Sequence, residues 1–107
     1  MPQYNKLVRD NIPDIIKATG KSFRTRILAP EEKKHMLQAK LQEELQEYLT
    51  ASTDQAALEE LADLLEVIDA LAVVHGRTWQ QLRQIQEAKR QHRGGFYQGI
   101  FLIDVDD

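Results

Sequence analysis

Along most of the chain, apolar side chains recur every three or four residues, which is the spacing of one face of an α-helix. This pattern predicts a first long helix from Pro30 to Leu49. Proline is tolerated in the first turn of a helix, and Glu31 and Glu32 suit the positive end of the helix dipole. The apolar stripe of this helix consists of Leu37, Leu41, Leu45 and Tyr48.

A second long helix is predicted after the polar break at residues 51–53, from Asp54 as its cap to about His75, with Gly76 ending it. Its main apolar stripe consists of Leu58, Leu61, Leu65, Ile68 and Ala72. A second set widens that stripe, namely Leu64, Val67, Leu71 and Val74. Because this apolar surface is wider than that of an ordinary surface helix, we expect the helix to pack on more than one side.

Two shorter helices and two strands complete the predicted pattern. Asn11 can cap a short helix that stops near Gly20, and Thr78 with Gln81 forms a capping box for a helix that ends before residues 94–95. Residues 22–28 and 96–103 are rich in β-branched and aromatic side chains, so we expect them to pair as a two-stranded β element. The expected fold is a single all-α domain over residues 1–107, a helical bundle with this minor β element.

Composition limits the classes of function. The chain has 107 residues, a formal net charge of −3 and no cysteine, which excludes disulfides and thiolate metal sites. An acidic chain is poorly suited to non-specific nucleic-acid binding, which depends on Lys and Arg neutralising phosphates. No apolar run reaches the length of a membrane span and the N-terminus has no apolar signal core, so we expect a cytoplasmic protein. A core this small gains area most readily from a second copy of the chain.

The residues with the clearest chemical meaning are two pairs of carboxylates. Glu44 and Glu47 lie three residues apart in the first long helix, and Glu60 and Asp63 have the same spacing in the second. Residues at this spacing are neighbours on one helix face, so two packed antiparallel helices would bring the four carboxylates together. Such a group repels itself unless it binds a cation, and Mg²⁺ prefers carboxylate oxygens and substrate phosphates. The pattern therefore indicates attack of water on a phosphoanhydride.

Glutamate-rich helices are also common as solvated faces without any function. Position favours a site here, because Glu44 falls between Leu41 and Tyr48 on the apolar stripe, where an unpaired carboxylate is costly. Glu60 and Asp63 run along the edge of the other apolar face.

Neighbouring acidic residues are less informative. Glu43 and Glu59 are expected to point further outward, as solvated residues or at most as supporting ones. Glu66 follows Asp63 by one turn, and both an accessory ligand and an exposed residue remain open for it.

Five basic residues are candidates for phosphate contacts: Lys6, Arg9, Lys40, Lys89 and Arg93. Lys6 and Arg9 project two cations from an otherwise apolar segment, and Lys40 lies one turn before Glu44, so it can pair with that carboxylate or with phosphate. Lys89 and Arg93 also suit the negative end of a helix dipole, which explains their place without a ligand.

These motifs together resemble the all-α nucleotide pyrophosphatases, a superfamily that includes MazG-like proteins, dimeric dUTPases and phosphoribosyl-ATP pyrophosphohydrolases. The central match is Glu44-x-x-Glu47 followed by Glu60-x-x-Asp63. The opening segment Tyr4-Asn-Lys-Leu-Val-Arg-Asp-Asn-Ile-Pro-Asp-Ile-Ile and the closing Lys89-x-x-x-Arg93-Gly-Gly-Phe96 resemble the phosphoribosyl-ATP pyrophosphohydrolase-like subgroup. The resemblance covers nearly the whole chain.

The resemblance implies a metal site in a four-helix arrangement, often completed by a homodimer or a higher homo-oligomer. It implies cleavage of a nucleoside triphosphate between the α and β phosphates, dependent on Mg²⁺ with Mn²⁺ as a substitute. It carries metal ligation and catalysis to Glu44, Glu47, Glu60 and Asp63. It carries phosphate or nucleotide contacts to Lys6, Arg9, Lys89 and Arg93. Among the four carboxylates, Glu47 is a candidate for the base.

One departure concerns the histidine-pathway enzyme, which has an aromatic residue and a histidine soon after its Glu-x-x-Asp motif. Here the motif continues as Asp63-Leu-Leu-Glu66-Val67, which argues against a role in histidine biosynthesis. Three interpretations therefore stand after the sequence alone. They are a nucleotide pyrophosphohydrolase with a house-cleaning role, a phosphoribosyl-ATP pyrophosphohydrolase, and a non-catalytic helical dimer whose acidic face binds a basic partner.

Overall fold

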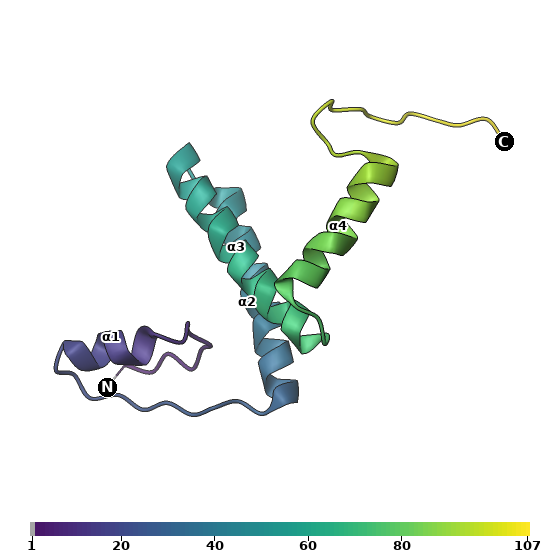
Figure 1. The fold of residues 1–107 in the computed structure, drawn as a ribbon. Coiled ribbons are helices and arrows are strands. Elements are labelled where there is room, and N and C mark those ends of the chain that lie inside the picture. The colour runs from purple at the N-terminus through teal and green to yellow at the C-terminus, as the bar shows by residue number, and fades with distance from the viewer. Residues whose placement is uncertain (1) are drawn as a thin grey trace.

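Four helices make up the regular structure in the computed structural model, which describes residues 2–107 (Figure 1). They are α1 (Ile12–Ala18), α2 (Pro30–Thr50), α3 (Asp54–Val74) and α4 (Trp79–Arg93). The all-α class is confirmed; α2 begins at the predicted Pro30, and α3 begins one residue earlier than a cap at Asp54 would place it.

The helix ends follow the expected chemistry with two corrections. Asn11 stands at the N-cap of α1, but its side chain makes no capping hydrogen bond. Thr78 and Gln81 form the predicted capping box, in which the Gln81 backbone N–H donates to Thr78 Oγ1 at 3.1 Å and the Thr78 N–H donates to Gln81 Oε1 at 2.9 Å. The cap of α3 is Thr53 instead of Asp54, because the Thr53 hydroxyl accepts the Ala56 N–H at 3.1 Å. Asp54 becomes the first helical residue, where its charge suits the dipole.

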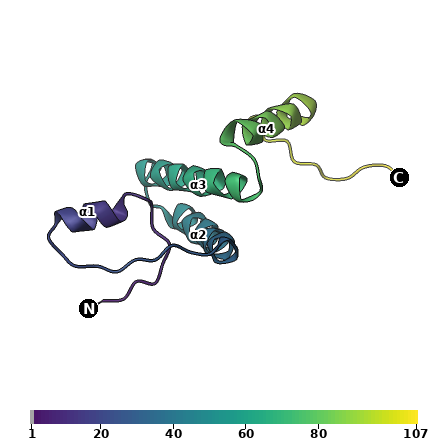
Figure 2. The same cartoon turned by 60° about the horizontal axis from the view of Figure 1, so that its bottom comes forward.

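α2 and α3 form an antiparallel hairpin that is the centre of the chain (Figure 1). Leu37 of α2 and Ala72 of α3 are its buried apolar residues. α4 contacts α3 and then diverges from the hairpin, so that the two helices enclose an open angle. α1 lies apart from the hairpin, connected to α2 by the extended segment 21–29 (Figure 2). The hairpin is therefore the part of the chain able to position side chains rigidly.

The predicted β element does not form in the single chain. Residues 22–28 and 96–103 contain no strand, and no backbone hydrogen bond joins them within residues 2–107. The physical reason is distance, because the second segment follows the diverging end of α4 while the first runs from α1 to the start of α2 (Figure 1). Apolar side chains of the tail are left exposed, among them Phe96, Ile100, Phe101 and Ile103.

Much of the apolar surface is uncovered. α3 packs mainly against α2 and makes a smaller contact with α4, so the expectation that it packs on more than one side is met only to a small extent. Its exposed apolar residues include Leu58, Leu61, Leu65 and Val73. The radius of gyration is 18.4 Å, whereas a compact domain of this length has a value of about 13 Å. In the part of the chain that the structure describes, no helix is long and apolar enough to cross a lipid bilayer.

Candidate metal centre

The hairpin brings the predicted carboxylates of α2 and α3 together. Glu44, Glu60 and Asp63 each offer an oxygen, and these oxygens lie within 4.8 Å of one another. The spacing explains this, because residues three apart share a helix face and the antiparallel helices turn those faces toward each other. We call Glu44, Glu47, Glu60 and Asp63 the carboxylate cluster.

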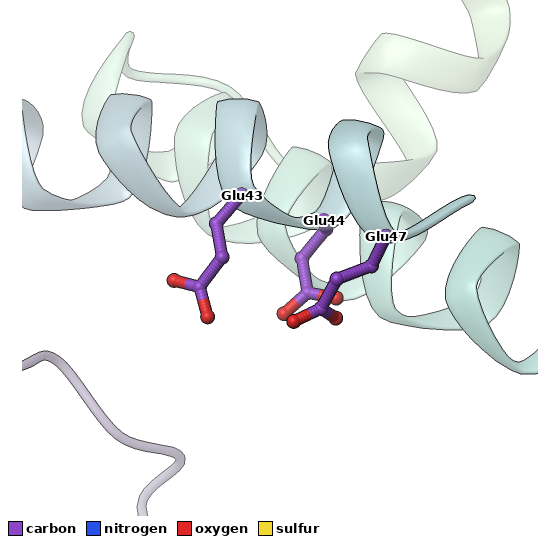
Figure 3. A group of neighbouring side chains, drawn as sticks. All are labelled: Glu43, Glu44 and Glu47. Atoms are coloured by element: carbon purple, nitrogen blue, oxygen red, sulfur yellow. The ribbon is translucent and has the colours of Figure 1, made fainter. Parts of the chain in front are cut away.

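α2 contributes a second, overlapping group. Oxygens of Glu43, Glu44 and Glu47 also lie within 4.8 Å of one another. Figure 3 shows the three side chains leaving the same side of α2, with the carboxylates of Glu44 and Glu47 next to each other. Glu43, expected to point outward, is exposed but stands at the rim of the cluster. Its spacing of four residues from Glu47 was the sequence signal for this position.

Burial distinguishes this group from a solvated acidic face. Glu44 is 9% exposed, and among residues 2–107 it is the one charged residue that is buried. Glu44 Oε2 and Glu60 Oε2 are both shielded from solvent and have no hydrogen-bond partner. Unpartnered buried carboxylate oxygens are costly, and native proteins satisfy them with a donor or a cation. The donor set is all oxygen, as a hard divalent cation such as Mg²⁺ requires, so these residues fit that ion.

The electrostatics of the cluster agree with its geometry. Burial is the main cause that raises the pKa of Glu44 to about 7, and the nearby carboxyl groups of Glu60, Glu47 and Asp63 add to it. The pKa of Glu60 is also raised, because burial, Glu47 and Asp63 together outweigh the interaction with Glu44 that lowers it. A cation in the cluster would offset this mutual repulsion.

This raised pKa gives a pH-dependent stability in the absence of metal. Between its ordinary value of 4.5 and about 7, Glu44 keeps its proton in the folded state and loses it in the unfolded state. The free energy of unfolding should therefore fall as pH rises through this window. In chelator-treated protein, we expect a loss of roughly 1–3 kcal/mol from about pH 5 to pH 8, measured by urea unfolding.

The variant Glu44→Gln is the control for that measurement. It keeps the side-chain volume and removes the titrating group, so its loss of stability over the same pH range should be smaller. The other charged groups around this carboxyl, Lys40, Glu47, Glu60 and Asp63, are the same in both proteins. Identical pH profiles for the wild type and this variant would contradict the electrostatic account.

Two of the predicted basic residues lie at the cluster. Lys40 Nζ is 3.4 Å from Glu43 Oε2 and 4.0 Å from Glu44 Oε1, one helical turn away. Arg9 Nη2 is 2.5 Å from Asp63 Oδ1, which brings the N-terminal segment to α3. The sequence pattern placed both residues among the phosphate-contact candidates but gave no signal that Arg9 pairs with Asp63.

The other candidates, Lys6, Lys89 and Arg93, form no ion pair with the cluster among residues 2–107. The Lys6 ammonium lies 5.8 Å from the centre of the Tyr4 ring. Lys89 and Arg93 are at the end of α4, which diverges from the hairpin (Figure 1). Glu66 is exposed and lines a shallow hollow together with Asp69 and Trp79. Its carboxylate does not belong to either group of clustered oxygens.

Comparisons with known proteins indicate the family to which the sequence is similar. The family model described as phosphoribosyl-ATP pyrophosphohydrolase matches residues 9–90, a range that includes the whole carboxylate cluster and Arg9. An uncharacterised protein of Mycolicibacterium smegmatis is 46% identical over 54 residues, which cover 50% of this chain and 55% of that relative. The match therefore spans about half the length of this curated relative. No solved structure matches the chain.

Proposed function

Because the chain belongs to the phosphoribosyl-ATP pyrophosphohydrolase family, we propose that it is a Mg²⁺-dependent enzyme that hydrolyses a nucleoside triphosphate between the α and β phosphates. The products are a nucleoside monophosphate and pyrophosphate. The observation that carries the proposal is the buried carboxylate of Glu44, which has an unpartnered oxygen at the meeting point of two acidic groups.

The residues of the carboxylate cluster would hold Mg²⁺, with Mn²⁺ as a substitute. A bound ion of this kind neutralises phosphate charge and makes a water molecule more acidic. The part played by the protein is to fix the oxygens, since Glu44, Glu60 and Asp63 project from two packed helices instead of a mobile loop. Pre-positioned ligands lose little entropy when the substrate binds.

The side chains around the cluster have distinct roles in this proposal. Glu47 is the more exposed glutamate of the α2 pair, so solvent water can reach it and it serves as the base. The water oxygen forms a bond to a phosphorus atom of the substrate as its proton passes to Glu47. The bridging P–O bond then breaks, and pyrophosphate leaves with the electron pair of that bond. Lys40 and Arg9 supply positive charge next to the reacting phosphates.

The substrate class is that of nucleoside triphosphates, and both canonical and damaged bases are included. A house-cleaning role in the cytoplasm, where these nucleotides are synthesised, is part of the proposal. Phosphoribosyl-ATP is the second candidate substrate, favoured by the description of the matching family. The sequence Asp63-Leu-Leu-Glu66-Val67 argues against it. Lys6, Lys89 and Arg93 stay proposed phosphate contacts on the strength of the motif resemblance.

The test is product analysis over a panel of ribo- and deoxyribonucleoside triphosphates, oxidised and methylated nucleotides, and phosphoribosyl-ATP. We expect monophosphate and pyrophosphate in equal amounts from at least one compound, and none when a chelator replaces Mg²⁺. Preferential cleavage of phosphoribosyl-ATP would select the second candidate. Release of inorganic phosphate and a diphosphate would contradict cleavage between the α and β phosphates, and absence of turnover would favour a non-catalytic helical dimer.

We further propose that a second copy of the chain covers the exposed apolar face of α3. Within residues 2–107, the buried apolar residues are Leu37 and Ala72, and these make too small a core to stabilise a chain of this length. The exposed apolar residues of α3 and of the tail are the surface that such a dimer would bury. The four-helix surroundings implied by the motifs would then come from two hairpins.

A further inference from the structure

The contact between Arg9 and Asp63 differs from the other ion pairs of the chain. It joins residues 54 positions apart at a distance of 2.5 Å. The other pairs in residues 2–107 join Arg26 to Glu32, and Lys40 to Glu43 and Glu44, and their members are at most six residues apart in sequence. Arg9 belongs to the irregular segment before α1, so this pair connects that segment to the hairpin.

Asp63 has two competing uses in this structure. Its carboxylate is one of the three oxygens that gather between α2 and α3, and it is also the acceptor of the Arg9 guanidinium. A guanidinium at this carboxylate removes negative charge that a divalent cation would use, and it repels the cation directly. Arg9 and a metal ion therefore compete for the carboxylate of Asp63.

The same side chain is suited to a second partner. A guanidinium binds carboxylates and phosphates through the same planar arrangement of N–H donors. The pair is also partly solvated, with the side chains of Arg9 and Asp63 59% and 39% exposed, so it contributes little stability and is readily exchanged. A nucleotide phosphate bound at the cluster would lie next to Arg9 and provide a replacement acceptor.

We propose that Arg9 is an exchange residue, which holds Asp63 while the site is empty and transfers to a substrate phosphate when the metal and nucleotide bind. This inference rests on the proposed function of the cluster. The N-terminal segment then responds to the nucleotide. A metal ion that binds alone must compete with Arg9 for Asp63, whereas in the metal–nucleotide complex Arg9 binds a phosphate of the nucleotide. Arg9 thus favours the productive complex over binding of the metal alone.

The experiment is calorimetric titration of the full chain with Mg²⁺ alone, and then with an α,β-methylene nucleoside triphosphate in the presence of Mg²⁺. Arg9→Gln should bind Mg²⁺ alone roughly threefold to tenfold more tightly than the wild type. The same variant should bind the analogue roughly tenfold to hundredfold more weakly. Arg9→Lys keeps the charge, so its Mg²⁺ affinity should stay near that of the wild type.

Arg26→Gln is the matched control, because it removes the same charge and breaks an exposed pair with Glu32 away from the cluster. Both of its affinities should equal those of the wild type. Unchanged or weaker Mg²⁺ binding by Arg9→Gln, alongside normal binding by the wild type, would overturn the exchange role and leave the proposed function standing. A wild type that binds neither Mg²⁺ nor the analogue would overturn both.

Discussion

Replacing Glu44 by alanine is expected to abolish Mg²⁺-dependent pyrophosphate release and to leave the helical content of the protein intact. Glu44 is the residue shared by both groups of clustered oxygens, and it is the one buried carboxylate among residues 2–107. Its loss removes the ligand on which both groups depend, so turnover should fall by roughly a thousandfold or more. The measurements are a pyrophosphate-release assay at saturating nucleotide and far-ultraviolet circular dichroism.

The fold should survive this change because, without metal, the buried Glu44 carboxylate destabilises the folded state. Removing it ends its repulsion with Glu47, Glu60 and Asp63 and leaves only a small cavity. Glu44→Gln keeps the volume and should be equally inactive, which separates loss of the ligand from loss of packing. Glu59→Ala removes an exposed carboxylate next to Glu60 and should retain activity. Turnover at the wild-type rate in Glu44→Ala would remove the cluster from the mechanism.

Replacing Leu65 by aspartate is expected to dissociate the proposed dimer and to lower the thermal stability of the protein sharply. Leu65 is 51% exposed in the single chain, and a substitution at such a position normally changes stability by about 0.5 kcal/mol or less. A charge buried in an interface costs several times more. Because the single chain has so small a core, we expect the melting temperature to fall by about 10 °C or more.

The dimer prediction is checked by sedimentation velocity at micromolar concentration together with thermal unfolding. Gln55→Asp introduces the same side chain at an exposed polar position of the same helix, and it should leave both the mass and the melting temperature unchanged. A wild type that sediments as a monomer, with Leu65→Asp equally stable, would refute the proposed interface on α3.

Local patterns predicted the parts of the fold that local physics decides. Helical spacing of apolar residues located α2 and α3, and the capping box at Thr78 marked the start of α4. The position of Glu44 between Leu41 and Tyr48 predicted its burial, because a helix fixes which residues share a face. The meeting of Glu44 with Glu60 and Asp63 then followed from the antiparallel hairpin.

The features that were missed depend on tertiary arrangement. Residues 22–28 and 96–103 have strand-like composition, but pairing requires proximity, and the divergence of α4 separates them in one chain. The pair between Arg9 and Asp63 spans 54 residues and has no periodic signature. The cap of α3 is Thr53, one residue before the predicted Asp54. Both side chains are good caps, and a sequence pattern does not distinguish between adjacent capping residues.

The central claim is that the carboxylate cluster binds a divalent cation, and electron paramagnetic resonance of Mn²⁺ tests it most directly. Titration of the wild type with Mn²⁺ should show saturable loss of the free-ion signal, with the signal restored by excess Mg²⁺. Glu44→Ala and Asp63→Asn should each bind Mn²⁺ much more weakly, whereas Glu59→Ala should bind it as the wild type does. Equal Mn²⁺ binding by all four proteins, or no binding by the wild type, would contradict the account.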